Sequence, residues 1–116
     1  MTSLTLYHNP RCSKSRQALA LLRERDLEPK LRLYLEQPPN TEELQQLLAL
    51  LDATPRALLR EGEALYRELG LDRALPDAEL LRYLAAHPSL LQRPIAVSAE
   101  RAVIGRPPER ILELLS

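Results

Sequence analysis

The first 35 residues switch between two hydrophobic periods, and this switching restricts the fold more than any other feature of the chain. Residues 4–7 are a short, mainly apolar run that predicts a buried strand. Residues 13–25 carry leucine and alanine at helical spacing, and residues 30–35 alternate leucine with polar side chains, which predicts a second strand. A strand, a helix and a strand in so short a segment imply a right-handed crossover between two parallel strands.

The middle of the chain, residues 40–87, carries only helical periodicity. Asn40 and Glu43 have the spacing of a capping box, so a helix is predicted to begin at Asn40. The leucines that follow recur three and four positions apart, which is typical of one buried helix face. Further helical segments are predicted at residues 55–59, 63–69 and 77–86.

The period changes again after this helical block. Residues 94–98 and 101–104 are two short β-rich segments that predict a hairpin. A last helix is predicted to begin near Pro107, because proline suits the first helical position. This order of elements is that of a thioredoxin-like (glutaredoxin-like) α/β fold, with a four-stranded mixed sheet and a helical insertion at about residues 40–87. We expect a single domain over residues 1–116.

Composition excludes several classes of protein. The formal net charge is zero and the sequence pI is about 6.7, so bulk charge gives no case for binding nucleic acid or a membrane surface. We expect no signal peptide and no membrane-spanning segment, because no apolar run is long enough. The single cysteine excludes an intramolecular disulfide, so a cytoplasmic location with a reduced thiol is expected. We expect no metal site, no bound cofactor and a monomeric chain.

That cysteine, Cys12, lies where the first strand ends and the first helix begins. The first N–H groups of a helix lack internal partners and, with the helix dipole, favour negative charge. A thiol at this position ionises more easily, and the thiolate is the reactive form. Arg11, Lys14 and Arg16 add positive charge. The alternative is a buried cysteine acting as a small hydrophobic residue, but the polar and cationic flanks favour a nucleophile.

Two polar residues near Cys12 leave alternatives open, and a third polar residue, farther along the chain, has an expected structural role. His8, whose side chain has an unperturbed pKa of about 6.5, either modulates the thiol or caps a turn by hydrogen bonding. Ser15 lies three residues after Cys12 on the same helical face, and it either donates to the thiolate or caps the helix. His87 stands before a proline at a predicted helix end, where a structural stop is expected.

The chain resembles the ArsC family, the glutaredoxin-coupled arsenate reductases and their relatives, including Spx. The resemblance covers essentially the whole chain. It rests on six motifs in order: Tyr-His-Asn-Pro-x-Cys at 7–12, Leu-Tyr-Leu-Glu at 33–36, Arg-Ala-Leu-Leu-Arg at 56–60, His-Pro at 87–88, Arg-Pro-Ile at 93–95 and Arg-Pro at 106–107.

The resemblance implies a role for individual residues. Cys12 matches the family nucleophile, His8 the histidine near the thiol, and Pro94 the proline that is cis in thioredoxin-like folds. The three arginines that surround the oxyanion in the family match Arg60, Arg93 and Arg106. Taken alone, each arginine would be expected at the surface. Guanidinium groups suit a tetrahedral oxyanion because they donate two parallel hydrogen bonds.

The resemblance also implies a reaction and its partners. Arsenate would bind among the arginines and form an adduct with Cys12, glutathione would act as co-substrate, and glutaredoxin would then release Cys12 from a mixed disulfide. Because Ser13 and Lys14 stand where the best-known family members have Gly-Thr, the substrate is left open to another thiol-reactive oxyanion or a glutathione mixed disulfide.

Two further alternatives are a Spx-like regulator that binds RNA polymerase and a thioredoxin-fold scaffold without catalytic activity. Spx proteins typically use a Cys-x-x-Cys switch, but Ser15 occupies the second cysteine position here. An unreactive Cys12 would support the scaffold.

Overall fold

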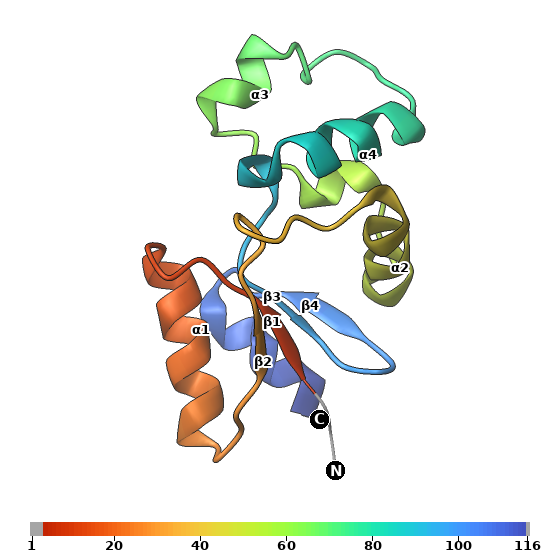
Figure 1. Cartoon of the computed structure of the whole chain (residues 1–116). Helices are drawn as coiled ribbons and strands as arrows, with labels where there is room; N and C mark the ends of the chain where they lie inside the picture. The colour runs from red at the N-terminus through yellow and green to blue at the C-terminus, as the bar shows by residue number, and fades with distance from the viewer. Residues whose placement is uncertain (1–3, 116) are drawn as a thin grey trace. The chain divides into compact units, whose positions relative to one another are not determined.

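The computed structural model describes residues 4–115, which divide into two compact units (Figure 1). The residues up to Gln37 and those from Arg93 onward form what we call the sheet unit, and Pro38–Gln92 form the helical unit. The predicted helical insertion at residues 40–87 lies within the helical unit. That the whole chain is one domain stays a prediction, and the units are described separately.

The sheet unit contains a four-stranded mixed sheet in the order β2-β1-β3-β4. β1 pairs in parallel with β2, whereas β3 is antiparallel to both β1 and β4. This confirms the predicted thioredoxin-like α/β fold, with its parallel β1–α1–β2 crossover and its β3–β4 hairpin. The strands are β1 (Thr5–Tyr7), β2 (Lys30–Arg32), β3 (Ile95–Val97) and β4 (Ala102–Ile104).

Two helices pack on one face of this sheet: α1 (Ser13–Glu24) and the 3-10 helix η3 (Pro108–Leu115) (Figure 1). Leu6 of β1 and Ala96 of β3 point to the same face because they are register partners. They join the buried side of both helices in one aliphatic core. Its fully or nearly buried members are Leu4, Leu6, Ala18, Leu19, Leu22, Ala96, Ile111 and Leu114.

The second strand is shorter than its leucine pattern predicted. The predicted strand ran to Leu35, but β2 ends at Arg32 and the chain then turns. β2 is an edge strand that pairs only with β1, whose last residue, Tyr7, is the partner of Arg32. With no partner beyond that point, Leu33 accepts turn hydrogen bonds, and Leu35 is 46% exposed.

The end of the chain also differs in detail from the prediction. The last helix begins where the prolines predicted it, but its backbone is a 3-10 helix throughout. Ile111 and Leu114 are buried, whereas Leu115 is 37% exposed. The 3-10 geometry repeats every three residues, so Leu115 does not share the face of Ile111 and Leu114.

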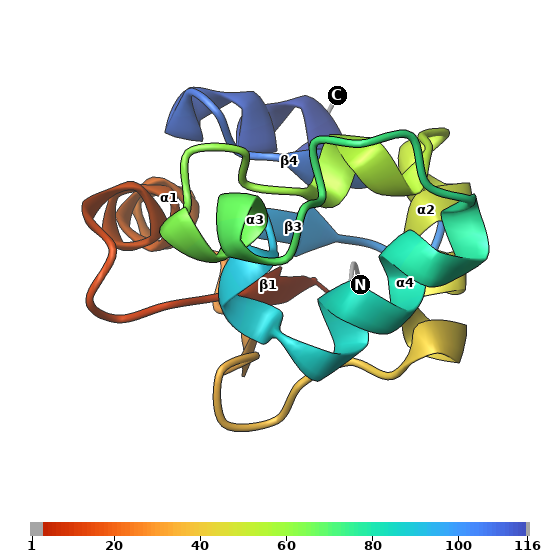
Figure 2. The same ribbon diagram turned by 90° about the horizontal axis from the view of Figure 1, so that it is seen from above.

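The helical unit follows the predicted helix boundaries closely. Asn40 caps α2 through a complete capping box with Glu43, at 2.8 and 3.2 Å. α2 lies beside α4 (Figure 2), and both helices carry buried leucines. The elements are α2 (Thr41–Leu51), η1 (Pro55–Leu58), α3 (Ala64–Glu68), α4 (Asp77–Ala86) and η2 (Pro88–Leu90).

Arg56 connects η1 to α3 and to the loop before α4 by hydrogen bonds. Its guanidinium donates to the hydroxyl of Tyr66 at 2.9 Å, to the carbonyl of Leu71 at 3.0 Å and to the carbonyl of Arg73 at 3.2 Å. These acceptors lie on α3 and on the loop before α4. The first arginine of the Arg-Ala-Leu-Leu-Arg motif is therefore a structural residue of this unit. None of the helices described between residues 4 and 115 is both long and apolar enough to cross a membrane.

Candidate active site

The sheet topology brings the candidate site residues to one end of the sheet. Tyr7, the last residue of β1, pairs with Ile95, the first residue of β3, and Ile95 also pairs with Ile104 at the end of β4. Because β3 runs antiparallel to both neighbours, the segment after β1, the segment before β3 and the segment after β4 leave the sheet together. These segments carry Cys12, Arg93 and Arg106.

Asn9 organises the turn between β1 and α1. Its side-chain oxygen accepts the N–H of Arg11 at 3.0 Å, and its carbonyl accepts the N–H of Cys12 at 3.0 Å. Its own N–H donates to the Ser15 hydroxyl, a long contact of 3.4 Å, and Ser15 is fully buried. The guanidinium of Arg16 donates to the Pro10 carbonyl at 2.9 Å. The turn is thus fixed from both sides of Cys12.

Cys12 is the N-cap residue of α1, and its backbone is extended rather than helical. In the described part of the chain, α1 has no side-chain cap hydrogen bond at its N-cap, so the first N–H groups of α1 remain available to the sulfur. The thiol is partly exposed. Burial raises the pKa of the Cys12 thiol, but hydrogen bonds from the Ser15 N–H, the Arg93 side chain and the Lys14 N–H, together with the Arg93 charge, lower it below its ordinary value.

Arg93 is the arginine that acts on Cys12 through both hydrogen bonding and charge. Its side chain is only partly exposed, and its Nε is buried without a hydrogen-bond partner among the described residues. A buried guanidinium N–H without an acceptor is costly and is an unusual feature in a folded protein. The Arg93–Pro94 peptide bond is cis, as the resemblance implies, and the Arg106–Pro107 bond is cis as well.

Gly105 and Arg106, which follow β4, hold the segment that carries Arg93. The Gly105 N–H donates to the Pro94 carbonyl at 2.8 Å, and Arg106 Nε donates to the Arg93 carbonyl at 3.0 Å. A Cβ on Gly105 would lie 2.9 Å from side-chain atoms of both Pro94 and Ile111. Only a glycine allows this approach without rearrangement. Gly105 is not among the residues predicted from the motifs, although a glycine directly before the Arg-Pro motif is a usable signal.

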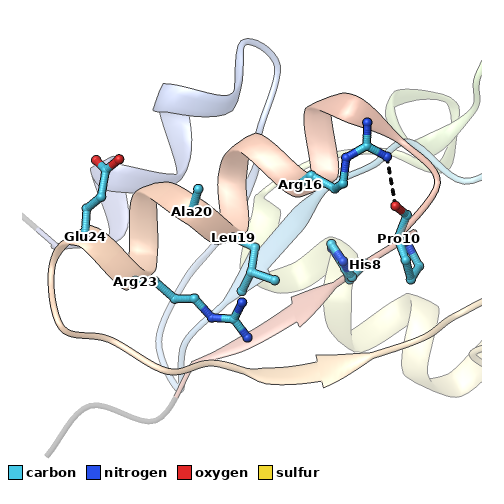
Figure 3. Close-up of a pocket in the computed structure, with 7 residues that line it drawn as sticks. All are labelled: His8, Pro10, Arg16, Leu19, Ala20, Arg23 and Glu24. Atoms are coloured by element: carbon cyan, nitrogen blue, oxygen red, sulfur yellow. Dashed lines mark hydrogen bonds between the residues drawn. The ribbon is translucent and has the colours of Figure 1, made fainter.

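His8 is the first residue of the turn between β1 and α1, and Cys12 is the last. It is 4% exposed and lines a cavity of about 610 Å³ beside α1 (Figure 3). Burial, followed by the charges of Arg23 and Arg16, lowers the pKa of His8, which favours the neutral imidazole. Its Nδ1 is buried without a partner among the described residues. The charged groups that act on His8 therefore belong to α1, and a direct action of His8 on the thiol stays a prediction.

Arg60 belongs to the helical unit. Its guanidinium forms an ion pair with Glu63 three residues later, and its backbone N–H donates to the Leu90 carbonyl at 2.7 Å. The side chain of Arg60 is 24% exposed. Its predicted role at the oxyanion stays a prediction, because Cys12 and Arg60 lie in different units. Within residues 4–115, no group of three or more histidine, cysteine, aspartate or glutamate side chains is placed to hold a metal ion.

A thioredoxin-like sheet, one cysteine at the N-terminus of α1 and an arginine beside that cysteine are the features of a thioredoxin-fold protein with a single cysteine at its candidate active site. The model of the ArsC family matches residues 7–114, and the chain belongs to this family.

Individual relatives resemble almost the whole chain. It is 46% identical over 112 residues to the uncharacterised protein YfgD of Escherichia coli K12, with 95% of this chain and 94% of that protein covered. It is 42% identical over 115 residues to an arsenate reductase of Haemophilus influenzae, with 97% and 99% covered. The solved structure of an arsenate reductase from Vibrio cholerae is similar with a TM-score of 0.94 at 46% identity, covering 97% of each chain.

Proposed function

We propose that this protein reduces arsenate to arsenite, with Cys12 as the nucleophile and glutathione as the electron donor. The observation that carries the proposal is the pairing of the Cys12 thiol with Arg93. The pKa of this thiol is lowered, and the Nε–H of Arg93 is buried without an acceptor within residues 4–115. An incoming oxyanion supplies that acceptor. Relatives named arsenate reductase at 42% identity and higher support the choice of arsenate.

The first step is the formation of a bond between the Cys12 sulfur and arsenic. The thiolate attacks the arsenic atom, and one arsenate oxygen leaves as water after taking up protons. The charge of Arg93 reduces the repulsion between the two anions, and its guanidinium stabilises the oxygens as charge redistributes. The N–H groups of Lys14 and Ser15 lower the pKa of the Cys12 thiol before the attack and compensate for the negative charge of the sulfur.

The second step transfers the electrons. The glutathione thiolate attacks the adduct, and a sulfur–sulfur bond forms between glutathione and Cys12. The two electrons of the broken sulfur–arsenic bond remain on arsenic, which leaves as arsenite. Glutaredoxin then takes the glutathione from Cys12 by thiol–disulfide exchange and restores the free thiol. A chain with one cysteine requires such an external thiol. We place this reaction in the cytoplasm, where glutathione keeps thiols reduced.

The remaining predicted residues have supporting roles in this proposal. By resemblance to the family, Arg60 and Arg106 are the other two arginines of the oxyanion site. Ser15 contributes its backbone N–H to the sulfur and its hydroxyl to the Asn9 turn. His8, held neutral beside Arg16 and Arg23, adds no positive charge next to the turn at neutral pH.

The test is arsenate-dependent NADPH oxidation in the presence of glutathione, glutaredoxin and glutathione reductase. We expect turnover by the native chain and at least a thousandfold lower rate for Cys12→Ser, because the nucleophile is lost. Equal rates for the two proteins would overturn the proposal. If Cys12 is reactive but arsenate is not turned over, another oxyanion or a glutathione mixed disulfide becomes the substrate to test; an unreactive Cys12 redirects the work to binding of RNA polymerase.

A further inference from the structure

The carbonyls of Arg93 and Pro94 lie directly before β3, outside the paired residues of the sheet. Strand pairing on β3 begins at Ile95, and Pro94 has no N–H to contribute to the ladder. The carbonyls of Arg93 and Pro94 therefore need hydrogen-bond donors from outside the strand ladder. Both partners come from the two residues that follow β4: the Gly105 N–H at 2.8 Å and the Arg106 Nε at 3.0 Å.

These two contacts fix the backbone of Arg93 relative to the hairpin. The contact from Gly105 depends on the missing Cβ, which would otherwise collide with Pro94 and Ile111 at 2.9 Å. The contact from Arg106 uses a charged donor, and hydrogen bonds with one charged partner are roughly twice as strong as neutral ones. The side chain of Arg93 leaves this fixed backbone toward Cys12, where it stabilises the thiolate.

We propose that Arg106 is a positioning residue, which holds the Arg93 carbonyl so that the Arg93 guanidinium stays against Cys12 before any oxyanion is bound. The proposal rests on the proposed function only in treating Cys12 as the reacting thiol. Arg106 itself is exposed, and its Nε is already used by the Arg93 carbonyl. Its effect on the sulfur is therefore transmitted through Arg93.

This role differs from that of an oxyanion ligand in two measurable ways. A residue that only binds the oxyanion affects the reaction when the oxyanion is present and leaves the free thiol unchanged. A residue that acts on the thiolate by its own charge has an effect that adds to that of Arg93. A positioning residue changes the free thiol, and its effect disappears once the Arg93 guanidinium has been removed.

The experiment is a double-mutant cycle read out by iodoacetamide alkylation of Cys12 against pH, without arsenate or phosphate. The proteins are the native chain, Arg106→Ala, Arg93→Gln, the double variant and Arg110→Ala as a control. Arg110 is an exposed arginine paired with Glu113 on η3. At a pH below the thiol pKa, we expect Arg93→Gln to slow alkylation about tenfold and Arg106→Ala about threefold, since one pKa unit is a factor of ten.

The double variant is expected to react at the same rate as Arg93→Gln alone, and Arg110→Ala at the native rate. A further threefold loss in the double variant, or native reactivity of Arg106→Ala, would overturn the proposal. Arg106→Met, which keeps the aliphatic stem, replaces the alanine variant if circular dichroism shows that the latter is unfolded. Because no arsenate is present, the cycle gives its answer whether or not the protein reduces arsenate.

Discussion

Arg56 in the helical unit and Arg93 in the sheet unit carry the same guanidinium group, but their surroundings differ. Arg56 donates to three oxygen atoms between 2.9 and 3.2 Å, all of them from α3 or the loop that follows. Arg93 has a buried Nε without an acceptor among the described residues, and its side chain acts on the Cys12 sulfur. An arginine with three acceptors stabilises a fold, whereas one with an unused buried donor has a hydrogen bond left to make, which is the basis of its proposed role at the oxyanion.

The largest expected effect concerns Arg93. Replacing it by alanine should lower kcat/KM for arsenate about a hundredfold, because a charged donor to the reacting oxyanion is lost from the transition state. The coupled NADPH assay measures this loss. Arg67→Ala, which removes an exposed arginine of the helical unit, is the control and should retain native turnover. Native turnover by Arg93→Ala would contradict the proposed role of Arg93 at the oxyanion, and with it the contrast between Arg93 and Arg56.

Arg56→Ala should instead affect stability. Three acceptors lose a charged donor, and two of them are backbone carbonyls in a partly buried loop. We expect the free energy of unfolding to fall by about 2–3 kcal/mol, measured by urea denaturation. The pH dependence of Cys12 alkylation should remain native under folding conditions. A change in the thiol midpoint without a change in stability would contradict the structural role of Arg56.

Two glycines give a smaller contrast between the units. Gly105→Ala places a Cβ 2.9 Å from both Pro94 and Ile111, so we expect a destabilisation of about 1–3 kcal/mol from overpacking. Gly62→Ala is the matched control, because no atom of the described residues beyond its chain neighbours lies within 4 Å of its Cβ position. It should be neutral or slightly stabilising, since alanine restricts the unfolded chain. Equal thermal denaturation curves for the two variants would show that the hairpin end tolerates the extra methyl group.

The smallest effect is expected from His8 and depends on pH. Its pKa in the folded protein lies below the unfolded value of about 6.5. As the pH falls below that value, the unfolded chain binds a proton first, so stability decreases toward the folded pKa and is unaffected well above 6.5. His8→Asn should remove this loss, which we expect to be at most about 1 kcal/mol between pH 7.5 and 5.5.

Urea denaturation at the two pH values measures this loss, with His87→Asn as the control at the other histidine of the chain. The control should keep the native dependence on pH. If His8→Asn becomes less stable at low pH to the same extent as the native chain, another group is responsible.

The order of elements and the position of Cys12 could be predicted because both follow from local patterns. Leucine spacing predicted the helices, and the capping box at Asn40 and Glu43 predicted where α2 begins. The end of β2 could not be predicted in this way. It depends on the length of β1, its only partner, rather than on the alternation of leucines that continues to Leu35.

The residues around Cys12 were only partly predictable. The resemblance to ArsC proteins identified Arg93 and Pro94, whereas the contacts of Gly105 and Arg106 with that segment depend on the β3–β4 register. No sequence pattern predicts that Arg56 bridges α3 and the following loop, because its acceptors are a tyrosine hydroxyl and two carbonyls distant in sequence. Side-chain acceptors of this kind are set by tertiary structure.

The central claim is that the α1 N-terminus and Arg93 lower the pKa of the Cys12 thiol below its ordinary value. The most direct measurement is the thiol pKa of the native chain, from the rate of iodoacetamide alkylation across pH. The account predicts a midpoint below the ordinary value of about 8.5, and a higher midpoint for Arg93→Gln. A native midpoint at or above 8.5 that does not move when Arg93 is replaced would contradict it.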